Sequence, residues 1–347
     1  MSGKGVDQEL KEKQYFHGLI VRDDVADLLF KEGEFMLRVT EPKMGMVQSV
    51  VISVLHDKSI ASTEGISHYI IRNDEKGYHC EKFSCKTIPE LVEKYIKTGA
   101  GLDSAGKVKL VHKSVRQPWE LENKDVHLEK KLGEGAYGEV WMGAYIPKGN
   151  TKEKISVAVK QTHMENLNKE QINEVMGEAR IMRKNPHPNI VRLIGIASLE
   201  QPLLIVMELA DHGSLDSYLQ KNGAQLSAAR KAEMCADVAF ALHYLKRQKI
   251  LHRDLAVRNC LLFKNNTVKL ADFGKSQPGP EYAMEPKEKL PIRWLSPETM
   301  VTRKFTFASE VWSFGIVCWE IFSNGAEPYP GFMVREVNEQ VGHLFLY

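Results

Sequence analysis

The segment Leu251-His252-Arg253-Asp254-Leu255-Ala256-Val257-Arg258-Asn259 decides the fold, because it brings charged and amide side chains together within a few residues. Asp254 can accept a proton, and Asn259 supplies an amide oxygen that suits a hard metal ion. Asp272-Phe273-Gly274 follows two short strand-like pieces at 260–263 and 267–270 and adds a carboxylate of the same kind. The two segments therefore bring carboxylate, guanidinium and amide groups together in one region of the chain, and the motifs upstream indicate what these groups do.

A glycine-rich segment lies upstream, Leu132-Gly133-Glu134-Gly135-Ala136-Tyr137-Gly138-Glu139-Val140. Its Gly-x-Gly-x-x-Gly spacing is a weak signal alone, since in a dinucleotide-binding fold it should open a helix and precede an acidic residue. Here strand-like segments flank it, and Val157-Ala158-Val159-Lys160 follows. Glycines let the backbone come close to phosphates. Lys160 ends an apolar strand, which argues against an ordinary solvated lysine.

These motifs, in this order, resemble the protein-kinase family. The resemblance implies a bilobal fold in which Lys160 holds the α- and β-phosphates of ATP and pairs with Glu178 on a helix at 169–184. It also implies that Asp254 accepts the proton of the substrate hydroxyl, or orients that hydroxyl, and that Asn259 and Asp272 hold Mg²⁺, with Mn²⁺ as the alternative ion.

Val206-Met207-Glu208-Leu209-Ala210 resembles the strand and hinge at the back of the kinase cleft, with Met207 as the gatekeeper. Glu208 and Ala210 would offer backbone hydrogen bonds to adenine. The implied ATP-binding residues are Leu132, Gly133, Glu134, Gly135, Ala136, Tyr137, Gly138, Val140, Lys160, Glu208 and Ala210.

Two segments resemble tyrosine kinases rather than Ser/Thr kinases. Ser/Thr kinases usually carry a lysine two residues after the catalytic aspartate, whereas this chain has Ala256 there and Arg258 two residues later. Pro291-Ile292-Arg293-Trp294-Leu295-Ser296-Pro297-Glu298 resembles the segment that positions tyrosine substrates. Tyr282 is the candidate for autophosphorylation, and its phosphate would pair with Arg253. The alternative for Tyr282 is an inert, exposed tyrosine.

The first part of the chain carries an arginine in an apolar strand, Phe35-Met36-Leu37-Arg38-Val39. Strand alternation places Met36 and Arg38 on one face. A buried arginine is costly without solvent or a fixed anion. Two interpretations follow for Arg38: a structural ion pair with a nearby carboxylate, or a pocket that binds an anion from outside.

Tyr15-Phe16-His17-Gly18-Leu19-Ile20-Val21-Arg22 and Gly33-Glu34-Phe35-Met36-Leu37-Arg38 resemble the opening and the central strand of an SH2 domain, although Tyr15 replaces the usual tryptophan. The resemblance implies that Arg38 binds phosphotyrosine and that Arg22, Thr40 and His68 complete the pocket. The planar fork of arginine matches two phosphate oxygens, and such clusters are a known mode of peptide recognition.

The predicted class is α+β, with an SH2 domain followed by a bilobal kinase fold. The SH2 domain, a central antiparallel sheet flanked by two helices, is assigned to 14–113, a linker to 114–123 and the kinase domain to 124–347, with lobes at 124–208 and 211–347. Predicted SH2 elements are a helix at 22–31, strands at 34–40, 47–55 and 67–73, and a helix after the N-cap Thr87. Predicted kinase strands are 127–132, 138–146, 155–161, 190–198 and 203–208.

Composition limits the partners and the cellular compartment that are expected for this protein. A net charge of +2 over 347 residues does not favour nucleic acid as a partner, and five scattered cysteines without a Cys-x-x-Cys pair favour a reducing compartment. The N-terminus has no apolar signal core, Ser2 excludes the simple myristoylation pattern, and no apolar run approaches the ~20 residues of a membrane span. A cytoplasmic protein is expected, with recruitment to the inner face of the plasma membrane left open. The expected partners are phosphotyrosine proteins and tyrosine substrates.

The SH2–kinase combination, with its Trp-Glu-Leu linker, resembles the Fes/Fer group and in particular its compact nematode branch. Glu310 stands where kinases nearly always have an aspartate that braces the catalytic loop, so some loss of preorganisation is expected. The resemblance ends near Val341, so the second lobe is expected to be incomplete and Glu298 to lack its usual arginine partner. Two functions stay open: an active protein-tyrosine kinase, or an SH2 adaptor with a weak or inactive kinase domain. A Ser/Thr or dual-specificity kinase is disfavoured by Ala256 and Arg258.

Overall fold

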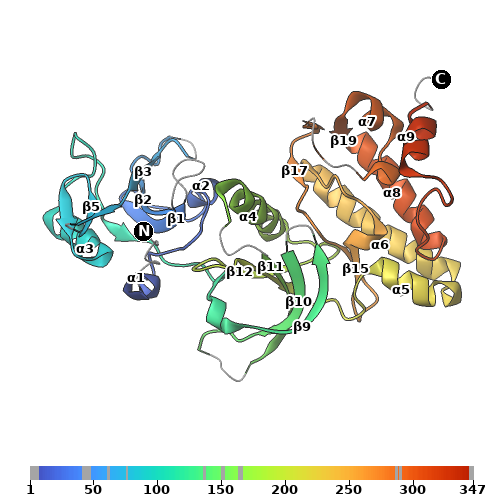
Figure 1. Ribbon diagram of the computed structural model, residues 1–347, viewed down its shortest axis with the longest axis horizontal. Helices are drawn as coiled ribbons and strands as arrows, with labels where there is room; N and C mark the ends of the chain where they lie inside the picture. The colour runs from blue at the N-terminus through green and yellow to red at the C-terminus, as the bar shows by residue number, and fades with distance from the viewer. Residues whose placement is uncertain are drawn as a thin grey trace. The chain divides into compact units, whose positions relative to one another are not determined.

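The chain folds into two compact units in the computed structural model (Figure 1). The structure describes residues 8–40, 48–60, 63–75, 77–135, 138–149, 153–162, 167–285, 288 and 291–343. One unit comprises Met1–Met176 with Ile194–Val206, and the other comprises Gly177–Leu193 with Met207–Tyr347. The division therefore falls inside the chain segment that was predicted to be one kinase domain.

The first unit begins with the central sheet predicted for an SH2 fold, in the strand order β3-β2-β1-β7. Phe35, Met36 and Leu37 are all fully buried, so both faces of β1 are covered. A second, three-stranded sheet has the order β4-β5-β6. The strands are β1 (Glu34–Thr40), β2 (Ser49–Leu55), β3 (Ile66–Ile70), β4 (Arg72–Asp74), β5 (Gly77–Cys80), β6 (Phe83–Cys85) and β7 (His112–Lys113). The strand predicted at 67–73 is thus divided at Ile71 between two sheets.

Helix α3 (Ile88–Thr98) starts where the sequence predicts, because Thr87 and Glu90 form a capping box. Helix α2 (Arg22–Val25) is much shorter than the predicted helix at 22–31. The backbone N–H groups of Phe30 and Lys31 donate to the Glu34 carboxylate instead of continuing a helical ladder, at 2.6 and 3.0 Å. The prediction was therefore wrong about the length of this helix. Helix α1 (Gln8–Glu12) was not predicted.

A six-stranded sheet in the order β8-β12-β13-β11-β10-β9 follows the linker. The predicted strands are all present, and helix α4 (Lys169–Lys184) has the predicted bounds. Val157, Val159, Ala197 and Val206 pack in the core beside this sheet. The strands are β8 (Glu120–Leu121), β9 (Val126–Gly135), β10 (Gly138–Tyr145), β11 (Ile155–Thr162), β12 (Leu193–Ala197) and β13 (Leu204–Glu208), and η1 (Asn123–Asp125) precedes β9.

The second unit is mainly helical, as predicted from Ser214 onward, and α6 and α8 lie side by side in it (Figure 1). Its helices are α5 (Leu215–Asn222), α6 (Ala228–Arg247), α7 (Pro297–Thr302), α8 (Phe307–Phe322) and α9 (Val334–His343), with short turns η2 (Gly223–Gln225), η3 (Val257–Asn259) and η4 (Ile292–Trp294). Three two-stranded pairs complete it: β14 (Ile250–Leu251) with β17 (Gln277–Pro278), β15 (Cys260–Leu262) with β16 (Val268–Leu270), and β18 (Glu281–Ala283) with β19 (Lys304–Thr306). Within the described ranges, no helix is long and apolar enough to cross a membrane.

The SH2 opening motif packs against the linker and the six-stranded sheet within the first unit. His17 is fully buried; its Nδ1 lies 2.6 Å from Glu120 Oε2 and its Nε2 lies 2.8 Å from Ser114 Oγ. Gly18 has φ +67°, and a Cβ there would lie 2.1 Å from the carbonyl oxygen of Ser198. Both residues of the motif are therefore required by this junction, and the linker is an ordered part of the fold.

We predict that His17→Ala lowers the free energy of unfolding by about 1–3 kcal/mol, because it removes the buried hydrogen-bond partner of Glu120 Oε2 and of Ser114 Oγ. Urea denaturation of the whole chain measures this change. His79→Ala is a matched control, since His79 and its partner Asp74 are both partly exposed, at 31% and 52% of their side-chain surface. Equal effects of the two substitutions would contradict a structural role for the buried contact.

Candidate functional site

Glu310 on α8 braces the loop that contains Asp254. Its two carboxylate oxygens accept hydrogen bonds from the backbone N–H groups of His252 and Arg253, at 3.1 and 2.9 Å. Glu310 is 1% exposed, and burial raises the pKa of its carboxyl group. Arg253 has φ 67°, so the loop is held in a conformation that non-glycine residues rarely adopt. Both hydrogen bonds form with a glutamate at this position, and the expected loss of preorganisation relative to an aspartate stays a prediction.

Glu320, near the C-terminal end of α8, makes a second set of hydrogen bonds to the loop. Its Oε2 accepts hydrogen bonds from the Val257 backbone N–H at 3.1 Å and from the Trp294 indole N–H at 2.9 Å. Burial raises the pKa of Glu320 to about 7. Ser313 on the same helix donates its hydroxyl to the carbonyl oxygen of Trp294 at 2.7 Å. Helix α8 therefore ties the loop to the segment at 291–296.

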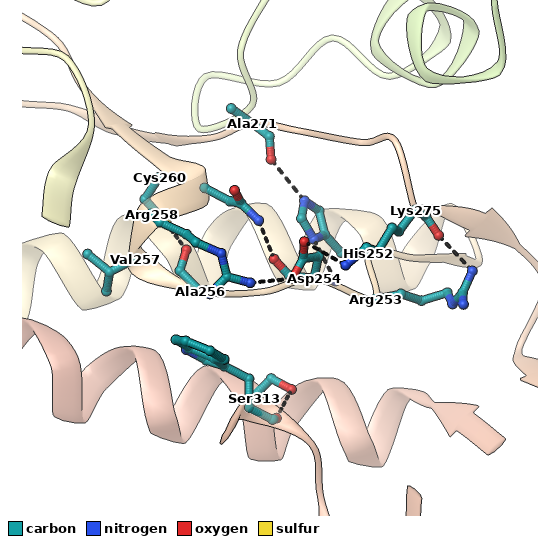
Figure 2. A network of polar contacts seen from close by, with 12 residues as sticks. His252, Arg253, Asp254, Ala256, Val257, Arg258, Cys260, Ala271, Lys275 and Ser313 are labelled. Atoms are coloured by element: carbon teal, nitrogen blue, oxygen red, sulfur yellow. Dashed lines mark hydrogen bonds and ion pairs between the residues drawn. The ribbon is translucent and has the colours of Figure 1, made fainter. Parts of the chain in front are cut away.

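Asp254 is held by cations on both carboxylate oxygens (Figure 2). Arg258 Nη2 lies 2.5 Å from Oδ1, and Lys275 Nζ lies 3.1 Å from Oδ2. Burial alone would raise the pKa of Asp254, but Arg258 and Lys275 outweigh it and hold the pKa below its usual value. The guanidinium of Arg258 also lies over the Trp294 ring, 4.2 Å from its centroid. The carboxylate is therefore ionised and fixed in orientation.

Two predicted metal ligands lie close to this loop. Asn259 donates its side-chain N–H to the backbone carbonyl of Asp254 at 2.7 Å, which leaves its amide oxygen as the atom that can bind a metal ion. His252 Nε2 lies 3.0 Å from the carbonyl oxygen of Ala271, directly before Asp272. Asp272 itself has φ 59°. An amide oxygen and a carboxylate oxygen are hard donors that suit Mg²⁺ completed by phosphate oxygens and water.

Glu178 lies near the Asp272-Phe273-Gly274 segment in the second unit. A Cβ built on Gly274 would lie 3.4 Å from Asp272 Oδ1 and 3.6 Å from Glu178 Oε2. Lys160, its expected partner, is on β11 opposite Val140 of β10. The expected Lys160–Glu178 pair stays a prediction.

The glycine-rich segment lies at the paired ends of β9 and β10, where Gly135 is opposite Gly138. A Cβ on Gly138 would lie 2.0 Å from the Gln161 carbonyl oxygen, so this glycine is required by the neighbouring strand. A Cβ on Gly133 would meet no atom within 4 Å, so packing does not explain that glycine. Leu132 is 51% exposed. Ala136 and Tyr137, two of the predicted ATP-binding residues, lie outside the described residues.

The predicted hinge is arranged around Met207 and Glu208 in the second unit. Met207 and Ala210 pack against a small cluster of Val191, Phe263 and Ala271. Glu208 accepts hydrogen bonds through its side chain from the Arg192 backbone N–H at 2.8 Å and from Lys269 at 2.7 Å. The roles of Met207 as gatekeeper and of Glu208 and Ala210 in adenine binding stay predictions.

Tyr282 on β18 contacts the arginine that was predicted to bind its phosphate. The Arg253 guanidinium lies 3.7 Å from the centroid of the Tyr282 ring. Arg253 also forms an ion pair with Glu288, and the Tyr282 hydroxyl donates to Glu288 Oε2 at 3.3 Å. Tyr282 is half-buried rather than freely exposed. The autophosphorylation of Tyr282 stays a prediction, but the inert, exposed tyrosine does not match its position.

Arg38 lies in a buried pocket without a carboxylate partner in the part of the chain that the structure describes. It is 4% exposed and donates to Ser53 Oγ at 3.1 Å and to the Ile20 carbonyl oxygen at 3.2 Å. Burial and the nearby charge of Arg22 lower the pKa of Arg38 to about 10. Two cations close together without an anion favour an external anionic ligand over a structural ion pair.

His68 and Ser53 complete the described part of this pocket. Ser53 Oγ lies 2.9 Å from His68 Nδ1, and His68 Nε2 is buried without a hydrogen-bond partner. Thr40, at the end of β1, is half-buried. The sequence reasoning missed Ser53, although a polar residue in the apolar strand Val50-Val51-Ile52-Ser53-Val54 was a usable signal. It also missed Lys275, Glu288 and Glu320, for which short-range sequence patterns give no signal.

Comparison with known proteins finds a family match for each of two segments of the chain. Residues 15–95 match the SH2 domain, and residues 126–344 match the family described as protein tyrosine and serine/threonine kinase. The chain is 38% identical over 329 residues to Fer-related kinase 1 of Caenorhabditis elegans, covering 94% of this chain and 81% of that protein. The chain belongs to the Fer-related family of SH2-containing, non-receptor protein-tyrosine kinases.

Longer relatives contain additional sequence. Tyrosine-protein kinase Fer of Rattus norvegicus is 36% identical over 338 residues, which cover 96% of this chain but 39% of that protein. The transforming protein Fps of avian sarcoma virus (strain PRCII), a tyrosine-protein kinase, is 34% identical over 339 residues, covering 97% of this chain and 61% of that protein. Membership in the kinase family implies the use of ATP and a divalent metal ion.

We predict that Glu310→Gln lowers kcat for peptide phosphorylation by roughly 10–100-fold, because it removes the negative charge and turns one of the two acceptor oxygens into an NH2 donor that faces a backbone N–H, and a lost buried hydrogen bond to a charged group is worth about 1.5–3 kcal/mol. Glu310→Asp keeps the carboxylate and should retain more activity. Glu233→Gln, on an exposed part of α6, is the control. Steady-state kinetics on folded protein measure the effect, and a wild-type kcat for Glu310→Gln would show that the brace is dispensable.

His68 predicts a pH dependence of stability. Burial, with the charges of Arg38 and Arg22, lowers the pKa of His68 to about 4. An unfolded histidine titrates near ~6.5, so between these values the unfolded chain binds more protons and stability falls as the pH falls. Urea denaturation between these two pH values should show a flatter dependence for His68→Asn than for wild type or for the exposed His112→Asn. Parallel curves for all three proteins would contradict this assignment.

Proposed function

We propose that this chain transfers the γ-phosphate of ATP to tyrosine hydroxyls of proteins and is directed to its targets by phosphotyrosine binding at Arg38. The observation that carries the catalytic part is the ionised Asp254, held by Arg258 and Lys275 in a loop that Glu310 braces. Phosphoryl transfer depends on positioning and charge neutralisation more than on covalent chemistry. A fixed carboxylate of this kind meets that requirement.

Asp254 would accept a hydrogen bond from the substrate hydroxyl and receive its proton as the bond from the hydroxyl oxygen to the γ-phosphorus forms and the bond from that phosphorus to the ADP leaving group breaks. Because the pKa of Asp254 is held below its usual value, the carboxylate is ionised and serves mainly to orient the hydroxyl. Asn259 and Asp272 would hold the divalent ion, for which we propose Mg²⁺ with Mn²⁺ as the alternative. That ion would neutralise phosphate charge when bound.

The choice of tyrosine would follow from the segment around Trp294. Arg258 contacts both Asp254 and the Trp294 ring, and Glu320 and Ser313 fix Trp294 on α8. The orientation of Asp254 is therefore linked to the segment that resembles the substrate-positioning region of tyrosine kinases. The ATP-binding roles of the glycine-rich segment, Lys160 and Glu178 are part of the same proposal.

Phosphotyrosine binding is supported by the buried Arg38 and the nearby, exposed Arg22 of the first unit. The phosphate would accept from Arg38, with Arg22, Thr40 and His68 around it, and would supply the anion that Arg38 otherwise lacks among the described residues. The partners would be phosphotyrosine proteins and tyrosine-containing substrates. Such ligands place the protein in the cytoplasm, and phosphotyrosine on a membrane protein would recruit it to the inner face of the plasma membrane.

The test combines a transfer assay with a binding assay. Wild-type protein with Mg-ATP and a tyrosine-containing polymer is expected to incorporate phosphate on tyrosine, and Asp254→Asn is expected to lose at least ~100-fold of that rate, consistent with loss of acid–base assistance. Arg38→Ala is expected to abolish binding of a phosphotyrosine peptide while Arg72→Ala, on the exposed strand β4, retains it.

An SH2 adaptor with a silent kinase domain is the second candidate. If wild type and Asp254→Asn are equally silent while the phosphotyrosine peptide still binds, the adaptor describes this chain. Unchanged peptide affinity in Arg38→Ala would overturn the role of that arginine.

A further inference from the structure

Hydrogen bonds to the loop that carries Asp254 hold the backbone of Lys275 close to the Asp254 carboxylate. Its carbonyl oxygen accepts a hydrogen bond from Arg253 Nη1 at 2.9 Å. The next residue, Ser276, donates its hydroxyl to the His252 carbonyl oxygen at 3.3 Å and its backbone N–H to the Phe273 carbonyl oxygen at 3.0 Å. The backbone of Lys275 is therefore held against the loop that carries Asp254, and its side chain extends from this fixed position (Figure 2).

The charges on Asp254 do not balance locally. Arg258 and Lys275 bring two positive charges to one carboxylate, and the Asp254 side chain is only 11% exposed. Arg258 is further occupied by the Trp294 ring. Lys275 makes no second ion pair within the described ranges, and its side chain is 34% exposed. An ammonium has three donors, so the bond to Asp254 leaves two for another acceptor.

We propose that Lys275 is a second cation of the transfer site and binds the transferred phosphate beside Asp254. This inference rests on the proposed transfer of phosphate to a hydroxyl held by Asp254. That hydroxyl would lie about 2.6–3.2 Å from the carboxylate, with the phosphorus roughly 3–3.5 Å beyond it. Lys275 Nζ, at 3.1 Å from Oδ2, then has the transferred phosphate within reach of a small side-chain movement.

The position two residues after Asp254 supports this assignment. Ser/Thr kinases usually carry a lysine at this position, whereas this chain has Ala256, which has no charge. Lys275 supplies a cation instead from the segment after Asp272-Phe273-Gly274. The opposite role is that of a lock, in which Lys275 stays bound to Asp254 and keeps the substrate hydroxyl away from the carboxylate. The two roles predict opposite changes in rate, which makes them separable by experiment.

The experiment compares Lys275→Met and Lys275→Arg with the control Lys264→Met, whose lysine is exposed and lies outside this cluster. With peptide substrate, Lys275→Met is expected to lower kcat by about 10–100-fold with little change in the peptide KM, since an electrostatic contact to developing charge acts on the transition state. Lys275→Arg should restore part of the rate. Lys264→Met should match wild type.

A binding measurement provides a readout that does not depend on turnover. Calorimetry gives the affinities for a non-hydrolysable Mg-ATP analogue and for Mg-ADP. Lys275→Met is expected to reduce the preference for the triphosphate by about tenfold, as loss of one charge-assisted hydrogen bond implies. Lys264→Met should leave the preference unchanged.

The outcomes separate this inference from the proposed function. A higher kcat in Lys275→Met would establish a lock and overturn the phosphate-binding role. An unchanged triphosphate preference would overturn it as well, even if kcat falls. If wild type transfers no phosphate, the proposed function fails, while the binding measurement still decides whether Lys275 contacts the terminal phosphate.

Discussion

The buried carboxylate of Glu310 is the contact on which the candidate active site depends. Two backbone N–H groups of one loop, from His252 and Arg253, converge on it, and they are held where Arg253 adopts a positive φ. Each donor meets its own carboxylate oxygen in a site that water does not reach, so replacing one oxygen with a donor group would leave a backbone N–H without its partner. The free energy lost by burying this charge is offset in part by the two hydrogen bonds, which fix the loop that carries Asp254 and Asn259.

The same principle operates in the first unit, where buried polar groups fix a loop or leave a ligand site. His17 is satisfied on both ring nitrogens by Ser114 and Glu120, so it holds a junction. Arg38 and His68 are only partly satisfied, and His68 Nε2 has no partner among the described residues. In this unit the fully satisfied His17 therefore has a structural role, whereas the unpartnered Nε2 of His68 near Arg38 supports a binding site.

Much of the fold could be predicted because its signals are local. Helix α4 has the predicted bounds, and α3 begins at its capping box, since caps and periodicity act over a few residues. The predicted length of α2 was wrong because the backbone N–H groups of Phe30 and Lys31 donate to the carboxylate of Glu34 in the next strand. In the site, Asp254, Asn259 and Arg38 came from motifs, whereas Lys275, Glu288 and Glu320 act through contacts between distant segments. The hydrogen bonds of Glu310 could not be predicted, because the reach of a side chain depends on the position of α8.

Amide hydrogen exchange at His252 and Arg253 tests the central role of Glu310 most directly. If the carboxylate holds both N–H groups, these amides exchange slowly in the wild type and at least one becomes fast in Glu310→Gln, while amides in the β15–β16 pair keep their protection. Fast exchange of both amides in the folded wild-type protein, or equal protection in Glu310→Gln, would contradict the account.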